Sequence, residues 1–252
     1  MLEKKGQLAV FVILAVVILV VILVFLLFPK ILPTGAGVFS PIPYLQACVE
    51  PHLQSALDVL TKRGGYSNPE GFLEYKGEKI KYLCYTSEYY KTCTVQEPFI
   101  KERVEQELSL IMRDKVEVCV EQLKEEYEKR GYSVVAGKGA VQALFAPQKI
   151  VLLAKTPMTI TKESTETFQD FSLEFKSELY DLLLTATSII SFETTYGDSE
   201  TTLYMQYYPD LKIEKIKLSD GSKVYTLTNV ITKDSFRFAS RSLSWPPGYA
   251  SQ

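Results

Sequence analysis

The pattern of apolar and polar positions divides the chain into a uniformly apolar N-terminal part and a long part with mixed patterns. From Leu8 to Phe28 the sequence is an unbroken run of 21 apolar residues. Because a helix rises about 1.5 Å per residue, this run is long enough to cross the roughly 30 Å hydrocarbon core of a bilayer. We therefore expect residues 1–28 to comprise a cytoplasmic stub and one transmembrane helix, with the lipid bilayer as its partner.

Proline and glycine dominate the next segment. Residues 29–43 contain four prolines and two glycines, a composition that opposes helix and predicts a semi-extended spacer. Residues 44–252 are long enough to bury a core of their own, so we expect them to form one extracytoplasmic domain.

Three helical patterns are expected in that domain. Apolar residues recur at helical spacing from Leu45 to Leu60, with a break or kink expected at Pro51. A longer amphipathic pattern covers residues 98–130. A third helix is expected to carry one apolar face from Phe168 to Ile189, with acidic residues near its N-terminal end.

The remaining patterns predict strands joined by short turns. Asp220-Gly221 lies between two β-prone runs and is the strongest hairpin signal in the chain. Short turns favour antiparallel pairing, so the fold class expected is α+β, with about three helices packed on antiparallel sheet. The predicted strand regions are residues 72–95, 132–136, 140–145, 150–161, 211–218, 223–232 and 235–240.

Charge restricts both orientation and partners. The whole chain carries −2 and residues 1–30 carry +2, so the rest carries −4, and the pI is near 5.7. A mildly acidic domain lacks the basic stripe that nucleic-acid binding requires. Lys4 and Lys5 precede the apolar run, which predicts a cytoplasmic N-terminus and an extracytoplasmic C-terminal domain at the cell membrane.

Four cysteines and a single histidine limit the candidate chemistry. The spacing of Cys48, Cys84, Cys93 and Cys119 contains no Cys-x-x-Cys pair, so no metal site is expected. An even number of cysteines outside the membrane favours two disulfides, for which three connectivities are possible. Cys84 and Cys93 lie in a β-prone hairpin region, and Cys48 and Cys119 lie on two predicted helices. We favour these two pairs, with buried free thiols as the alternative for the helical pair.

No catalytic or cofactor site is expected. His52 has acidic neighbours on its helix, but no nucleophile-elbow sequence accompanies it. Gly137-Lys138-Gly139 lacks the rest of a phosphate-binding loop and indicates a turn.

Tyrosine clusters are the remaining notable feature. Tyr82, Tyr85, Tyr89 and Tyr90 form a possible interaction surface, since an exposed ring offers a rigid apolar face with a polar tip. A second group comprises Tyr204, Tyr207 and Tyr208. Burial on a sheet is the alternative for both groups.

The N-terminus resembles a known class of export signals. Lys4-Lys5-Gly6-Gln7 directly before the apolar run resembles the class III, prepilin-type signals of archaeal surface proteins. The resemblance implies cleavage between Gly6 and Gln7 by a prepilin peptidase, with other surface or pilus proteins as possible partners. Phe11 departs from that pattern, because many pilins have an acidic residue there.

The chain up to about Cys119 also resembles a group of uncharacterised archaeal membrane-anchored proteins. The shared landmarks are the Lys-Gly-Gln start, Cys48, Gly64-Gly65-Tyr66 and Cys119. This group implies no activity. The function expected is non-enzymatic, a structural or interaction role at the cell surface. The alternatives are a pilin-like filament subunit and a membrane-anchored hydrolase.

Overall fold

The computed structural model describes residues 14–20 and 40–243. The chain divides into two compact units, Met1–Ser40 and Pro41–Gln252. In the first unit, residues 14–20 are helical and exposed. The expected cleavage site at Gly6 and Gln7 and most of the predicted spacer lie outside the described residues.

The expectation of a membrane-spanning helix is not supported by the structure. Within residues 14–20 and 40–243, no helix combines the length and the apolar character needed to cross a bilayer. Of the apolar run from Leu8 to Phe28, only residues 14–20 are among those described. This part of the fold-class prediction is therefore corrected.

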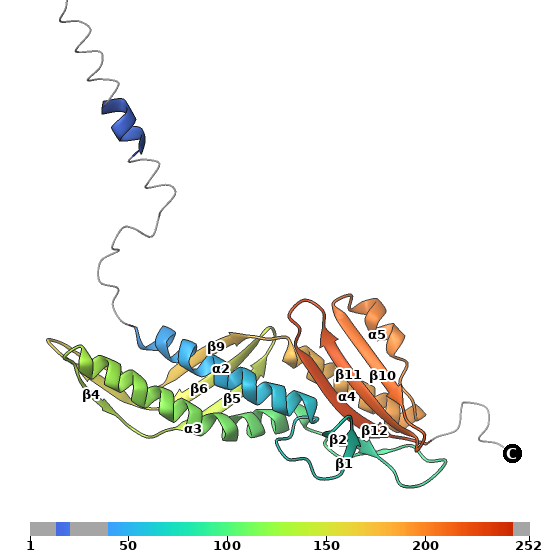
Figure 1. The fold of residues 1–252 in the computed structure, drawn as a ribbon. Helices are drawn as coiled ribbons and strands as arrows, with labels where there is room; N and C mark the ends of the chain where they lie inside the picture. The colour runs from blue at the N-terminus through green and yellow to red at the C-terminus, as the bar shows by residue number, and fades with distance from the viewer. Residues whose placement is uncertain (1–13, 21–39, 244–252) are drawn as a thin grey trace, which may run out of the picture. The chain divides into compact units, whose positions relative to one another are not determined.

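Two long helices, α2 (Pro41–Lys62) and α3 (Ile100–Lys129), lie side by side in the second unit (Figure 1). Helix α2 begins inside the segment that the sequence suggests as a spacer, because proline fits the first turn of a helix. It runs through Pro51 without ending there. Both helices bury the apolar stripes predicted from their periodicity. A disulfide between Cys48 and Cys119 joins them, with a Cα–Cα distance of 5.9 Å.

Two antiparallel three-stranded sheets follow α3 in the sequence. One has the order β5-β6-β9 and the other β4-β7-β8. Side chains of α3 cap the edge of β5: Ser109 Oγ accepts from Ala143 N at 2.8 Å, and Glu105 Oε1 accepts from Phe145 N at 2.7 Å. The strands are β4 (Ser133–Ala136), β5 (Ala140–Ala146), β6 (Lys149–Lys155), β7 (Met158–Thr161), β8 (Thr165–Phe168) and β9 (Phe171–Lys176).

A six-stranded sheet forms the other part of the unit. Its order is β1-β2-β12-β11-β10, with β3 paired to β2. The hairpin predicted at Asp220-Gly221 is confirmed, with Gly221 at φ +84°. Strands β2 and β12 pair in parallel, with Arg241 opposite Tyr85. The strands are β1 (Phe72–Tyr75), β2 (Glu78–Tyr85), β3 (Thr94–Val95), β10 (Leu211–Lys217), β11 (Ser222–Asn229) and β12 (Ser235–Arg241).

The third predicted helix begins later than expected. Helix α4 is Leu179–Tyr196, and the segment before it forms β8 and β9. Burial in β9 alternates residue by residue, with Phe171, Leu173 and Phe175 inside, which is the period of a strand. The spacing of Phe168, Phe171 and Phe175 fits a helix as well as a strand. A helix was predicted for this segment, and that prediction was wrong. A short helix, α5 (Thr201–Tyr207), was not predicted.

The described residues form an α+β structure, but its details differ from the prediction. Besides the helical residues 14–20, they contain four helices, α2 to α5, and twelve strands in three sheets. About three helices on antiparallel sheet were expected. The sheet content is higher because residues 165–176 are strands, and the parallel pairing of β2 with β12 joins segments about 150 residues apart that no local pattern could connect.

Candidate functional site

Helix α4 has a buried apolar face and an exposed face on which three large apolar side chains lie among serines and threonines. The buried face packs toward the six-stranded sheet and also contains one carboxylate, Glu193. The exposed face shows Leu184, Phe192 and Tyr196 to solvent. These three positions share a ridge of the helix, because they are spaced by multiples of four residues. The helix therefore presents an apolar ridge on the side opposite its core contacts.

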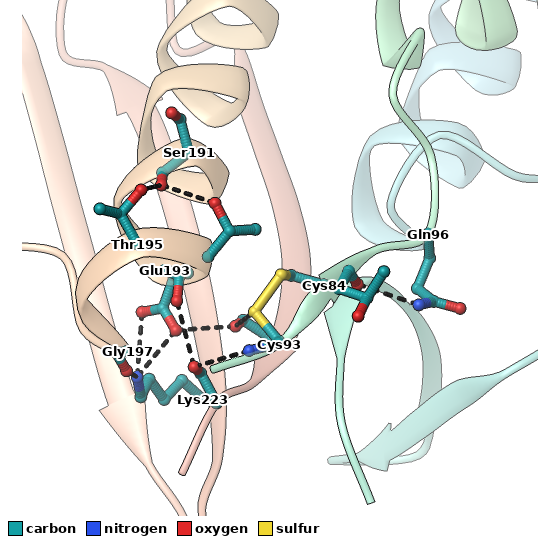
Figure 2. Close-up of a disulfide and its surroundings, with 12 residues drawn as sticks. Cys84, Cys93, Gln96, Ser191, Glu193, Thr195, Gly197 and Lys223 are labelled. Carbon is teal, nitrogen blue, oxygen red and sulfur yellow. Dashed lines mark hydrogen bonds and ion pairs between the residues drawn. A yellow bond between two sulfur atoms is a disulfide. The ribbon is translucent and has the colours of Figure 1, made fainter. Parts of the chain in front are cut away.

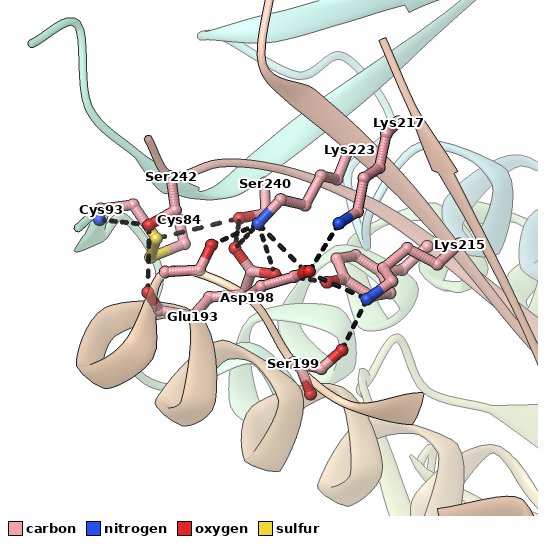
Figure 3. A network of polar contacts seen from close by, with 12 residues as sticks. Cys84, Cys93, Glu193, Asp198, Ser199, Lys215, Lys217, Lys223, Ser240 and Ser242 are labelled. Atoms are coloured by element: carbon pink, nitrogen blue, oxygen red, sulfur yellow. Dashed lines mark hydrogen bonds and ion pairs between the residues drawn. A yellow bond between two sulfur atoms is a disulfide. The ribbon is translucent and has the colours of Figure 1, made fainter. Parts of the chain in front are cut away.

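Glu193 is the centre of a buried polar cluster that fixes α4 to the sheet. Its side chain is 0% exposed, and both carboxylate oxygens accept from Lys223 Nζ, at 2.8 and 3.0 Å. Ser240 Oγ donates to the same carboxylate at 2.9 Å, and the Tyr225 hydroxyl donates to its other oxygen (Figure 3). Burial and the neighbouring charge of Glu193 raise the pKa of Tyr225 well above its usual range, so this phenol stays protonated as a donor.

Asp198 extends the cluster beyond the end of α4. Lys215, Lys217 and Lys223 approach its carboxylate at 3.0, 2.6 and 3.3 Å (Figure 3). Partial burial raises the pKa of Asp198, but hydrogen bonds from Lys217 and Lys215 outweigh it and hold the pKa well below its usual range. Lys215 Nζ also donates to the Ser199 carbonyl at 2.7 Å. Strand β10 is thus tied to the segment between α4 and α5.

The second disulfide, Cys84–Cys93, lies beside this cluster (Figure 2). Cys93 N donates to Ser242 Oγ at 3.0 Å, and Ser242 Oγ donates to the Glu193 carbonyl at 3.1 Å. The disulfide, the end of β12 and α4 therefore form one connected unit. Both disulfides are the pairs that their sequence contexts favoured.

Helix α5 places a second set of aromatic residues next to α4. Glu200 caps it by accepting from Thr202 N at 2.9 Å. The Tyr204 hydroxyl lies 2.7 Å from Ser188 Oγ of α4, and the Tyr204 ring meets Phe192 edge-on with centroids 6.4 Å apart. Tyr207 is 79% exposed, and Leu203 and Tyr208 are also exposed.

We call the exposed large apolar residues of both helices, together with Tyr208 directly after α5, the aromatic strip, and they form the candidate interaction site. A hollow of about 360 Å³ lies within it, lined by residues that include Phe192, Leu203 and Tyr207. A second cleft of about 470 Å³ lies between α4 and the ends of β10 and β11, and Tyr208 lines both. The strip comprises Leu184, Phe192, Tyr196, Leu203, Tyr207 and Tyr208.

The tyrosine cluster predicted at residues 82–90 is divided by the structure. Tyr82 is buried, with its hydroxyl 2.7 Å from Ser222 Oγ, so it is a core residue. Tyr85, Tyr89 and Tyr90 are exposed. The Arg241 guanidinium lies 5.8 Å from the Tyr85 ring centroid and 5.9 Å from that of Tyr89. This group has three exposed rings against the six side chains of the aromatic strip, and of the three only Tyr85 lines the hollow of about 320 Å³ that adjoins it.

Sequence reasoning noted Tyr204, Tyr207 and Tyr208 but missed Leu184, Phe192 and Tyr196. The signal was the presence of large apolar residues at positions 184, 192 and 196, which lie off the apolar stripe that the helical period assigns to the core. Only the face that proved buried was predicted.

His52 and the acidic side chains are the remaining candidates for catalytic or metal-binding chemistry. His52 is half-buried on α2. A cavity of about 130 Å³ beside α2 is lined by Asp58 and Asp234, but His52 is not among its lining residues. Across residues 14–20 and 40–243, no three His, Cys, Asp or Glu side chains are grouped as metal ligands would be.

Comparison with protein-family models, curated proteins and solved structures gave no match.

Proposed function

We propose that this protein is a non-enzymatic interaction protein of the cell surface, with its C-terminal domain outside the cytoplasm. The two disulfides support this location, because disulfides persist in oxidising compartments. In the sequence, Lys4-Lys5 and the apolar run from Leu8 to Phe28 support localisation at the membrane, with the N-terminus inside.

The aromatic strip is the observation that carries the interaction role. Its six side chains are exposed on α4, on α5 and at Tyr208, which directly follows α5, and aromatic residues are enriched where binding energy concentrates. A contiguous apolar surface of this kind costs free energy when left in water, so its cover by a partner is favourable. Glu193 and its partners hold α4 from behind, so the strip is presented on a rigid support.

Site-specific photo-crosslinking in cells tests this proposal. A benzoyl-phenylalanine in place of Tyr207 should give one discrete cross-linked product after illumination of intact cells. The same group in place of Val118, an exposed apolar residue on α3, is the control and should give none. The product should vanish when Phe192→Ser and Leu203→Ser are added.

Two results would contradict the proposal. Equal products from positions 207 and 118 would indicate non-specific encounters. Absence of any product at position 207, with the protein folded and accessible to added protease, would remove the strip as a binding surface.

A further inference from the structure

The cleft next to the aromatic strip combines an apolar wall with negative charge. Its volume is about 470 Å³, within the usual range of ligand pockets. Leu182, Leu211 and Ile231 are among its apolar lining residues. Tyr208 lines both this cleft and the hollow of the strip, so the two form one continuous surface along α4.

Among the described residues, three carboxylates line the cleft, and no lysine or arginine does. They are Glu178, Asp181 and Asp210. None of the three forms an ion pair with another residue of the part of the chain that the structure describes. By contrast, Asp198 is in contact with three lysines. The cleft therefore holds negative charge that the fold itself does not neutralise.

Repulsion between the carboxylates of the cleft also affects the pKa of Glu178. Burial raises the pKa of Glu178, and the charges of Asp181, Asp234 and Asp210 raise it further. Asp234 does not line the cleft, and its carboxylate already has a partner in the fold, since Asp234 Oδ2 accepts from Glu178 N at 2.6 Å. A cation in the cleft would relieve this repulsion.

We propose that the cleft and the aromatic strip together bind a basic peptide segment of a partner protein. A lysine or arginine side chain enters the cleft between Asp181 and Asp210, and neighbouring apolar side chains of the segment lie on the strip. This inference rests on the proposed function and names its partner class. A lone amine would fill only the cleft, whereas two adjoining hollows match a segment with both charged and apolar side chains. An anionic lipid surface or a nucleic acid would be repelled by the same carboxylates.

Peptide binding to the full-length protein in nanodiscs of zwitterionic lipid tests the proposal. The probe is a fluorescein-labelled twelve-residue peptide of Lys, Leu, Phe and Ala, followed by fluorescence anisotropy. The matched probe has Glu in place of every Lys. We expect binding of the lysine peptide only, and weaker binding at higher salt because the charges are partly exposed.

Variants separate the cleft from the strip. Asp181→Asn with Asp210→Asn should weaken binding about tenfold, the order expected when two partly screened charge contacts are lost. Glu125→Gln with Glu128→Gln, which removes the same charge from the exposed side of α3, should leave the affinity unchanged. Thermal unfolding of each variant checks that the fold is intact.

The possible outcomes are distinct. Equal binding of both peptides, or full affinity in the Asp181 and Asp210 variant, would overturn this inference. If Phe192→Ser with Leu203→Ser then still abolishes the cross-link in cells, the proposed function stands with another partner class. Saturation of the cleft by spermidine, with no gain from apolar residues in the peptide, would identify a small amine as the ligand and overturn the peptide proposal. Failure of both peptide binding and the cross-link would remove both proposals.

Discussion

At the residue scale, Glu193 and Lys223 form a pair whose members cannot be removed independently. Both side chains are almost completely buried, and each has its charge satisfied within the cluster. Taking two charges out of water is costly, so the pair adds specificity more readily than net stability. Loss of one member would leave an uncompensated charge inside the protein.

Lys223→Met should therefore lower the free energy of unfolding by about 3–5 kcal/mol, as measured by urea denaturation. Lys217→Met is the matched control, because Lys217 contacts the same cluster but is largely exposed. Its loss should cost less than about 1 kcal/mol. Adding Glu193→Gln to Lys223→Met should recover part of the stability. Similar small losses in both lysine variants would show that the buried pair is not needed.

Asp198 makes the stability of the folded protein sensitive to acid. Its pKa in the folded state lies below the value of about 4 expected when unfolded. The contribution of Asp198 to stability is thus complete above about pH 4 and is lost as the pH falls toward the folded pKa. Between about pH 6 and pH 3 the melting temperature should fall more in the natural protein than in Asp198→Asn. Parallel curves for the two proteins would contradict this assignment.

Only part of this site could be foreseen from the sequence. Tyr207 and Tyr208 were noticed because tyrosines cluster in the sequence itself. The pair of Glu193 and Lys223 joins positions 30 residues apart, and nothing in the neighbourhood of either indicates the other. The carboxylates of the cleft come from the residue before α4, from the first turn of α4 and from the turn before β10, so their proximity depends on tertiary packing.

At the element scale, the two disulfides constrain loops of very different length. Cys48–Cys119 closes a separation of 71 residues and joins α2 to α3, whereas Cys84–Cys93 closes a separation of 9. In the chain-entropy model, the stabilisation increases with the length of the closed loop. The helix-to-helix disulfide should therefore contribute more.

Cys48→Ser with Cys119→Ser should lower the free energy of unfolding by about 4 kcal/mol, and Cys84→Ser with Cys93→Ser by about 2.5 kcal/mol. Urea denaturation of both double variants measures the difference. A larger loss for the shorter loop would mean that its contacts with Ser242 and α4, rather than chain entropy, dominate.

The elements themselves show where sequence patterns suffice. The stripe from Ile100 to Tyr127 is long and regular, so α3 was predicted with its buried face correct. The segment of residues 165–176 is short, and the spacing of its apolar residues fits both a helix and a strand. The sequence also contained no sign that α3 covers the exposed edge of β5, because Ser109 and Glu105 lie more than 30 residues from the backbone groups that they bind.

At the scale of the whole molecule, charge and apolar surface are separated along the chain. Residues 1–30 carry +2, and the rest carries −4. The basic residues Lys4 and Lys5 lie in the part that prepilin-type processing would remove. Such processing is a proposal from the sequence, and its site lies outside the described residues.

Processing between Gly6 and Gln7 would change the N-terminus more than it changes the domain. The mature chain would begin at Gln7, directly before the apolar run, and would lose Glu3, Lys4 and Lys5. Since these lysines favour retention of the N-terminus in the cytoplasm, cleavage would remove the charge that fixes that orientation. Phe11 stands where many pilins have an acidic residue, so we expect cleavage without long filaments.

Intact-mass and N-terminal analysis of the protein from native membranes tests this expectation. The natural protein should begin at Gln7, and Gly6→Val should keep residues 1–6 and migrate more slowly on electrophoresis. Gly37→Val is the control, because it makes the same substitution beyond the apolar run and should leave processing unchanged. A natural N-terminus at Met1 or Leu2 would exclude prepilin-type processing. Long filaments in electron micrographs would instead show that an acidic residue at position 11 is not required for assembly.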